Sequence, residues 1–394
     1  MSDDVLERLA RQSASLESGE RDEAEVRLID APLIGDLPDR AALPGQSSAE
    51  GTARFADRMG GALPGFYRVE QGLRIASIGI GTYRGKVDPA TDAFYLSALR
   101  TAFKGGVNLI DTSIIYRGQQ SERIVGTAIR ELIEQGDGQR DELVVCTKGG
   151  YLVPEGGQLV SEAVNPATLE PGDVVDGVHS VAPAFLADQL SRSLRNLGLT
   201  TIDVYYLHNP EVQLRSVGIP EFRTRMRRAF ECLEAAASRG AIRYYGAATW
   251  GGFIDGIISL SALAEVAREI AGAEHHFRFV QLPFSLGMQE AWSAGTGPEA
   301  GVLDVARERG ITVIASASLL QGRFTGDLPP RLVKLLPGLA TDAQRAIQFA
   351  RSAPGIAAAL VGMSSSRHVE ENLAVASRPP LTRREFDRVR SAIH

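Results

Sequence analysis

The chain has 394 residues and a formal net charge of −6, with 44% hydrophobic and 23% charged residues. This balance is typical of a soluble globular protein, and the net negative charge argues against a general nucleic-acid binder. No apolar run reaches the roughly 20 residues of a membrane helix, and the acidic start "MSDDVLERLARQ" lacks the apolar region of a secretory signal. The two cysteines indicate neither a metal cluster nor a disulfide framework. Composition therefore predicts a cytoplasmic enzyme.

The first 65 residues differ in character from the rest of the chain. Stretches such as "SASLESGERDEAEVR" are rich in charge and small polar residues, and their hydrophobic periodicity is weak. Segments of this composition cannot bury enough apolar surface to order themselves. We therefore expect residues 1–65 to form an N-terminal arm that is partly disordered or loosely docked, followed by one folded domain over residues 66–394.

Short β-branched runs alternate with longer helical patterns from about residue 73 onward. The helical pattern "ATDAFYLSALRTAFKGG" has apolar residues three and four positions apart, and Gly105 and Gly106 supply its stop. Near-continuous apolar strands separated by helices predict parallel strands that are buried on both faces. The runs cover residues 75–82, 107–111, 142–148, 201–208, 242–249, 277–284, 311–318 and 356–363.

Eight such units predict the α/β class and a closed (β/α)₈ TIM barrel. A doubly wound open sheet is the competing architecture, and it would carry a Gly-rich phosphate turn at the start of its first helix. The stretch "GIGTYRG" matches that turn only weakly and leads into a loop, "KVDPATD", before the helix begins. The barrel is therefore the favoured fold.

One loop is much longer than its neighbours. Residues 149–182 separate the third strand from the next helix, where a barrel usually has two to six residues. Loops after barrel strands lie on the catalytic face, so we interpret this insertion as a lid or substrate-shaping loop rather than a decoration. His179 inside it is a candidate to reach the pocket.

Four ionisable side chains follow three neighbouring strands of the predicted barrel. Asp111 ends the second strand, Tyr116 lies in the loop after it, Lys148 ends the third strand and His208 ends the fourth. Each residue alone has an ordinary structural explanation, such as a strand end, a packed ring or a satisfied loop histidine. Because the carboxyl ends of parallel barrel strands share one face, their joint occurrence favours an active site.

These residue types suit the reduction of a carbonyl group. A phenol can protonate a nascent alkoxide, and a nearby ammonium is expected to lower the pKa of that phenol. A carboxylate beside the Lys keeps it charged, and the His can hydrogen-bond the substrate oxygen. The sequence contains no His-x-His pair or carboxylate cluster with metal-ligand spacing, so we predict chemistry without a metal.

The motifs that carry these residues resemble the aldo-keto reductase superfamily. They read "DTSIIY", "CTKGG" and "YYLHNP" in order, with "GAIRYYGAATW" and "LVGMSSSRHVEENLA" further on. The long loop after the Lys is similar to that of a bacterial subgroup. The resemblance implies a (β/α)₈ barrel and NADP(H)-dependent interconversion of carbonyl and alcohol. It makes Tyr116 the general acid or base, with Lys148 and Asp111 tuning it and His208 orienting the carbonyl.

The same resemblance implies a set of cofactor-binding residues. Gln281 matches a glutamine that binds the nicotinamide carboxamide, the loop around Ser318 matches one that covers the pyrophosphate, and the segment after the eighth strand matches the adenosine site. The full set is Gly81, Thr82, Tyr83, Thr249, Gln281, Ser316, Ser318, Leu319, Gln321, Gly362, Ser364, Ser365, His368, Glu371 and Asn372.

Three departures from the family pattern leave the choice between NADP(H) and NAD(H) open. Ala248 and Thr249 stand where the family usually has Ser-Asn, and Ser316 stands where a Tyr commonly stacks on the nicotinamide. His368 stands where an Arg often binds the 2′-phosphate, although the neighbouring Arg367 offers a replacement charge.

The favoured function is an NAD(P)(H)-dependent oxidoreductase that acts on an aldehyde, ketone, sugar or polyol. Two alternatives remain open. One is a redox-neutral lyase or epimerase on the same scaffold, and the other is a cofactor-sensing subunit for a partner protein. The expected partner is a small molecule, not a nucleic acid or a membrane. The sequence leaves the substrate, the physiological direction and the oligomeric state undetermined.

Overall fold

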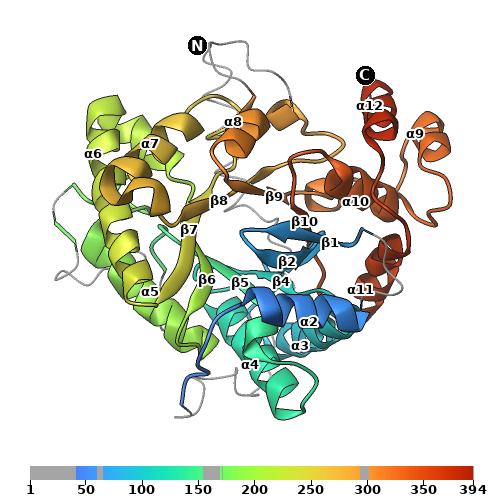
Figure 1. Cartoon of the computed structure of the whole chain (residues 1–394), viewed down its shortest axis with the longest axis horizontal. Coiled ribbons are helices and arrows are strands. Elements are labelled where there is room, and N and C mark those ends of the chain that lie inside the picture. Colours follow the sequence, from blue (N-terminus) through green and yellow to red (C-terminus); the bar gives the residue numbers. More distant parts are fainter. Residues whose placement is uncertain (1–40, 60–64, 154–168, 171, 293–300, 394) are drawn as a thin grey trace, which may run out of the picture. The chain divides into compact units, whose positions relative to one another are not determined.

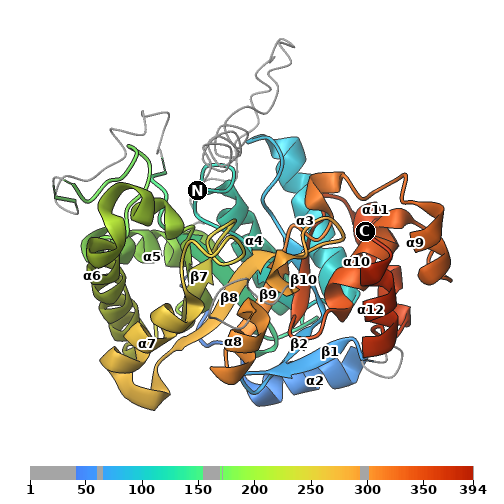
Figure 2. The ribbon, with the colours of Figure 1, turned by 90° about the horizontal axis from the view of Figure 1, so that it is seen from above.

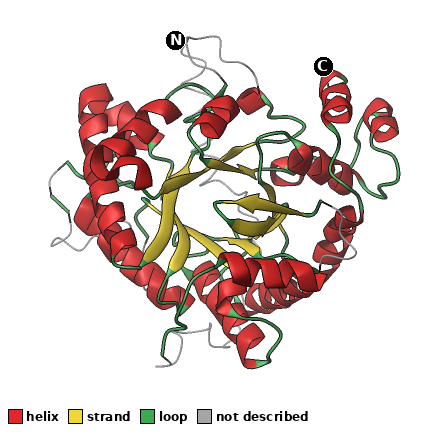
Figure 3. Cartoon of the chain, in the orientation of Figure 1, coloured by secondary structure: helices red, strands yellow, loops and turns green. Residues whose placement is uncertain are grey.

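The apolar runs form parallel strands that close into a barrel. A computed structural model describes residues 41–59, 65–153, 169–170, 172–292 and 301–393, which belong to one compact unit of the chain. In it, neighbouring strands follow the order β10-β3-β4-β5-β6-β7-β8-β9, and helices surround the ring (Figures 1 and 3). The strands are β3 (Ile78–Gly81), β4 (Leu109–Asp111), β5 (Val144–Gly149), β6 (Ile202–His208), β7 (Ile242–Ala248), β8 (Phe277–Pro283), β9 (Thr312–Ser316) and β10 (Ala358–Gly362). The predicted (β/α)₈ barrel is confirmed, and the open-sheet alternative is excluded.

Helices follow the strands and cover the outside of the barrel. Asp88 caps α3, since its side chain accepts a hydrogen bond from Thr91 N at 2.7 Å, and the predicted stop at Gly105 caps the other end. The helices are α2 (Ala49–Met59), α3 (Pro89–Lys104), α4 (Gln120–Glu134), α5 (Pro183–Leu197), α6 (Glu211–Ser238), α7 (Leu260–Ala271), α8 (Val302–Glu308), α9 (Pro330–Leu335), α10 (Asp342–Ser352), α11 (Ser366–Leu373) and α12 (Arg383–Ser391). None of the helices in the described ranges is long and apolar enough to cross a membrane.

A hairpin that the sequence did not predict closes the amino-terminal end of the barrel. Its antiparallel strands β1 (Tyr67–Glu70) and β2 (Leu73–Ala76) turn at Gln71 and Gly72, both with positive φ. Leu73 and Ile75 pack into the same buried cluster as residues that begin the barrel strands. The predicted first strand, 75–82, is therefore wrong in extent, because the run is shared between β2 and β3. Ser77 N donates to Phe66 O at 2.7 Å where the backbone changes partners.

The predicted boundary of the N-terminal arm needs correction. Helix α2 packs beside β1 and β2 (Figure 2), and Phe55 is buried in the core. Arg54 and Arg58 form ion pairs with Glu142, each at 2.9 Å. Residues 41–59 are thus part of the barrel unit, because α2 carries its own apolar face. Residues 1–40 lie outside the described residues, so that part of the arm stays a prediction.

The long insertion lies between β5 and α5, as the sequence indicated. Its two ends meet through isolated bridges that pair His179 with Tyr151 and with Val175. Residues 154–168 and 171 of the insertion lie outside the described residues. The interpretation of the whole segment as a lid stays a prediction.

Candidate active site

Three of the four predicted side chains meet around the Lys148 ammonium group. Lys148 Nζ donates to Asp111 Oδ2 at 2.6 Å, to the Thr112 carbonyl oxygen at 2.8 Å and to Tyr116 Oη at 3.2 Å. All three contacts come from β4 or from the loop that follows it, while Lys148 lies on the neighbouring strand β5. The parallel register therefore places a buried ion pair directly beside a phenol.

His208 borders the same phenol from the end of β6. Its ring centroid lies 6.0 Å from that of Tyr116, in an edge-to-face arrangement. Ser113 Oγ donates to the Lys148 carbonyl oxygen at 3.2 Å and lies 3.4 Å from His208 Nδ1. Burial, reinforced by the positive charge of Lys148, lowers the pKa of His208 well below its usual value. His208 is therefore a neutral imidazole at physiological pH.

The pKa of Tyr116 moves in the direction opposite to the sequence-based expectation. Burial raises it, and the nearby Lys148 ammonium offsets only part of that increase. Burial alone would lower the pKa of Lys148, but the Asp111 carboxylate and Tyr116 outweigh it and raise that pKa above the usual value. The arrangement thus holds a protonated phenol against a charged ammonium. A protonated phenol is a proton donor.

A buried ion pair holds the loop that carries Tyr116. Arg117, with a positive φ of 50°, donates to Asp92 of α3 and to the Lys86 carbonyl oxygen at 2.8 Å. The Arg117 guanidinium also lies 5.3 Å from the Tyr95 ring centroid. The sequence analysis missed these residues, although a charged residue directly after Tyr116 was the available signal. The contacts of Arg117 hold in place the backbone that positions the Tyr116 phenol.

His179 contacts the backbone of His208 rather than lining the candidate active site. Its Nε2 lies 2.7 Å from the His208 carbonyl oxygen, and Gln213 Nε2 donates to its Nδ1 at 2.9 Å. The tautomer with the proton on Nε2 satisfies both contacts. Gly150 makes room for this packing, because a Cβ there would approach His179 Nε2 within 2.9 Å, and its φ of +141° also favours glycine. The insertion is thereby fastened to the end of β6.

This buried histidine predicts a loss of stability in acid. Burial lowers the pKa of His179 to about 4, so its contribution is complete above pH 6.5 and disappears as pH falls from 6.5 toward 4. We expect the free energy of unfolding, measured with urea, to fall by about 2 kcal/mol from this residue between pH 7.5 and 5. His179→Gln should be less stable at pH 7.5 but show a shallower pH dependence. An unchanged pH slope in that variant would contradict the assignment.

Most of the residues predicted to bind the cofactor lie at or just after the ends of the remaining strands, whereas His368, Glu371 and Asn372 lie on α11. Those strands, β7, β8, β9, β10 and β3, are consecutive in the ring and adjoin the three strands of the catalytic candidates. Gln281 of β8 joins the two groups, because its Nε2 donates to Asp111 Oδ1 at 2.8 Å across the barrel. Tyr83 packs edge-on against Tyr116, with ring centroids 5.0 Å apart.

Two buried hydroxyl groups that follow these strands lack a partner within the described ranges of the chain. Thr249 Oγ1, after β7, and Ser318 Oγ, after β9, have no hydrogen-bond partner among the described residues. Buried polar groups are normally paired, so these two oxygens mark places where a polar ligand would satisfy them. Arg84 donates to Gln321 Oε1 at 2.8 Å, which joins the loop after β3 to the loop after β9.

The residues predicted to bind the adenosine part of the cofactor lie on α11 and directly before it. Ser365 caps this helix, its side chain accepting from His368 N. Arg367 and His368 are exposed, and Arg367 Nη2 lies 3.5 Å from His368 Nε2. Ser364 is half-buried, and Asn372 is buried. A cation is therefore available next to the position where the family usually has an Arg.

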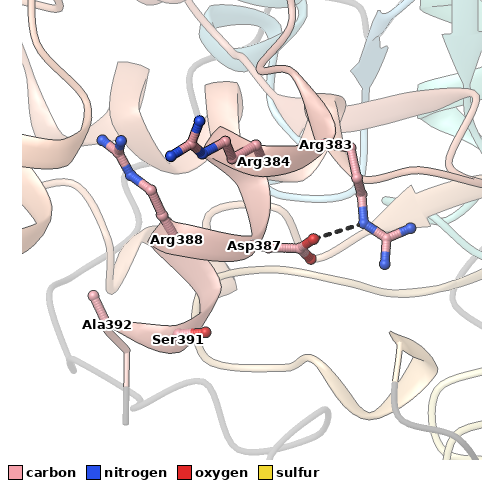
Figure 4. A pocket seen from close by; sticks show the side chains of 6 residues that line it. All are labelled: Arg383, Arg384, Asp387, Arg388, Ser391 and Ala392. Carbon is pink, nitrogen blue, oxygen red and sulfur yellow. Dashed lines mark hydrogen bonds and ion pairs between the residues drawn. The ribbon is translucent and has the colours of Figure 1, made fainter.

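A separate hollow of about 720 Å³ lies on α12 (Figure 4). Arg383 and Asp387 face each other there at 2.8 Å, and Arg384, Arg388, Ser391 and Ala392 complete the lining. None of these residues belongs to the strand ends, so this hollow is not the reaction site.

Among the described residues no three His, Cys, Asp or Glu side chains gather as a metal site would require, and metal-free chemistry stays a prediction.

Comparison with known proteins identifies the family. The model of the aldo/keto reductase family matches residues 77–329, well over half of the chain. The chain is 25% identical over 262 residues to an NADH-specific methylglyoxal reductase of Escherichia coli, covering 65% of this chain and 67% of that protein.

Solved structures share the fold. An aldo/keto reductase from Klebsiella pneumoniae in complex with NADP and acetate has 21% identity and a TM-score of 0.58, covering 84% of this chain and 96% of that one. The glycerol dehydrogenase of Gluconobacter oxydans has 20% identity and a TM-score of 0.59, covering 83% and 94%. Family match, barrel and strand-end geometry agree, and the chain is a member of the aldo/keto reductase family.

Proposed function

We propose that this protein is an NAD(P)(H)-dependent oxidoreductase that interconverts a carbonyl and an alcohol, with Tyr116 as the general acid in reduction and the general base in oxidation. The observation that carries the proposal is the contact of Lys148 Nζ with both Asp111 and Tyr116 at hydrogen-bond distance. A phenol held beside a paired ammonium is an acid whose conjugate base is stabilised as it forms. That is the property a carbonyl reductase needs.

The residues present fit a nicotinamide cofactor. Thr249 Oγ1 would receive the carboxamide and Ser318 Oγ the pyrophosphate, because both hydroxyl groups are buried and unpaired within the described residues. When bound, the cofactor supplies or accepts the hydride. Gln281 would bind the carboxamide as well, although in this structure its amide holds Asp111.

Residues of the chain itself carry out the proton transfer to the substrate oxygen. In reduction, Tyr116 Oη donates its proton to the substrate oxygen, and the resulting phenolate faces the Lys148 ammonium at 3.2 Å. Asp111 keeps that ammonium charged and in place. The neutral His208 polarises the carbonyl by donating to the same substrate oxygen from Nε2, in the tautomer that carries the proton there. In that tautomer the Ser113 hydroxyl turns from the Lys148 carbonyl oxygen, 3.2 Å away, to donate to His208 Nδ1.

Relatives of this chain use either cofactor. The Escherichia coli reductase is NADH-specific, whereas the Klebsiella pneumoniae structure contains NADP. Arg367 is the candidate ligand for a 2′-phosphate, since His368 has no permanent charge. We propose NADP(H) as the cofactor, with NAD(H) as the alternative.

The test is a fluorescence titration of the purified protein with NADPH and with NADH, followed by turnover assays with small aldehydes and ketones. Saturable binding and stoichiometric consumption of the reduced cofactor would support the proposal. Binding without net consumption while a substrate is converted would favour the redox-neutral alternative. Absence of binding by either cofactor would overturn the oxidoreductase, whereas cofactor binding without conversion of any substrate would favour the cofactor-sensing subunit.

Thr249→Val should separate cofactor affinity from protein stability. The change removes the unpaired hydroxyl group but keeps the shape of the side chain, so the dissociation constant of the cofactor should rise about tenfold. Stability without cofactor should stay the same or increase, because burying the hydroxyl without a partner costs free energy. Titration and urea unfolding measure the two effects, and Thr249→Ser serves as the control. Unchanged affinity in the Val variant would remove Thr249 from the cofactor site.

A further inference from the structure

Tyr151 places a second phenol beside His208. The two ring centroids lie 5.1 Å apart with the planes at 86°, and Tyr116 approaches the same imidazole at 6.0 Å and 81°. Tyr151 is only half-buried, so part of the residue is accessible. An oxygen held by Tyr116 and His208 would therefore have Tyr151 as a near neighbour.

The phenol of Tyr151 has a hydroxyl proton available for a ligand. Asn209 Nδ2 donates to Tyr151 Oη at 3.0 Å, so the oxygen already accepts one hydrogen bond. Within the described residues, no hydrogen bond is formed in which Tyr151 Oη is the donor. Burial raises the pKa of Tyr151 to about 12, so it remains a donor at physiological pH.

The chain fixes this phenol before any ligand arrives. Gln189 Oε1 accepts from Gly150 N at 2.8 Å, and Gln189 Nε2 donates to the Tyr151 carbonyl oxygen at 2.6 Å. The His179 ring packs edge-on against the Tyr151 ring, with centroids 4.9 Å apart. A donor held in this way loses little conformational entropy when it binds a substrate.

We propose that Tyr151 is a specificity-determining residue whose phenol donates a hydrogen bond to a second substrate oxygen on the carbon next to the reacting carbonyl. The preferred substrates are then α-hydroxy carbonyls and 1,2-dicarbonyls, or the corresponding vicinal diols in oxidation. This inference rests on the proposed function. Tyr116 and His208 hold the reacting oxygen, and Tyr151 binds the oxygen one carbon–carbon bond away.

The test compares glycolaldehyde with propanal, which differ by a hydroxyl group in place of a methyl group. The wild-type kcat/KM should favour glycolaldehyde by about ten- to a hundredfold. Tyr151→Phe should abolish most of that preference by lowering kcat/KM for glycolaldehyde alone, with propanal changed less than about threefold. A general structural defect would instead lower both values together.

Asn209→Asp provides an independent variant. Its carboxylate would accept the Tyr151 proton, so the same selective loss for glycolaldehyde is expected although the phenol remains. Equal losses for both aldehydes in both variants, or a wild-type enzyme without preference, would overturn the role of Tyr151 and leave the proposed function standing. Failure of the wild type to reduce any aldehyde, despite binding cofactor, would instead overturn the proposed function.

Discussion

Tyr116→Phe is expected to lower kcat for carbonyl reduction by about a hundredfold to ten-thousandfold, the range that general acid catalysis contributes. The variant keeps the ring, and its edge-to-face contacts with Tyr83 and His208 remain possible. It loses only the hydroxyl group that lies 3.2 Å from Lys148 Nζ. Cofactor affinity should change by less than about threefold, because this hydroxyl group is proposed to bind the substrate oxygen and not the cofactor. Stopped-flow or steady-state turnover and a cofactor titration measure the two quantities.

The pH dependence of the wild type supplies a second measurement on the same residue. Burial raises the pKa of Tyr116 above its usual value, so the acid form persists through neutral pH and the reduction rate should decline only above about pH 10. Tyr244→Phe is the matched control, since its phenol lies at the hairpin end of the barrel, 3.4 Å from the Gln71 carbonyl oxygen. If Tyr116→Phe and Tyr244→Phe kept equal activity, the assignment of Tyr116 as the acid would be wrong.

Lys148→Met is expected to reduce both stability and activity. The substitution leaves the Asp111 carboxylate buried without its counter-charge, and such a loss typically costs about 3–5 kcal/mol of unfolding free energy. Activity should fall as well, because no ammonium then stabilises the phenolate of Tyr116. Because the pKa of Lys148 is raised, the Lys148 charge and the stability that depends on it are retained as pH rises through neutral and are lost only above about pH 10.

A double-mutant cycle separates the two effects of Lys148. Lys148→Met combined with Asp111→Asn removes both charges, so stability should recover by about 1–3 kcal/mol relative to Lys148→Met alone. Activity should not recover, because the ammonium is still absent. Urea unfolding and turnover of the four proteins complete the cycle. A double variant whose stability loss equals the sum of the two single losses would show that the charges do not stabilise each other.

The sequence by itself determined the barrel and the meeting of the catalytic candidates. Each strand could be predicted because its own residues form an apolar run, and runs such as 201–208 and 242–249 match β6 and β7 closely. Asp111, Lys148 and His208 could be placed on one face from strand position alone. In a parallel barrel the carboxyl ends of all strands point the same way, so local position decides which side chains gather.

Only the tertiary structure decided features that depend on distant partners. The run 75–82 is continuous in composition, yet β2 pairs with β1 while β3 pairs with β10. The residues of a strand do not determine by themselves which strand it pairs with. The pKa of Tyr116 likewise required the degree of burial, which outweighs the Lys148 charge. The contacts of His179 and Tyr151 with His208 join a long insertion to a strand end. Such contacts arise from three-dimensional packing, which no local pattern encodes.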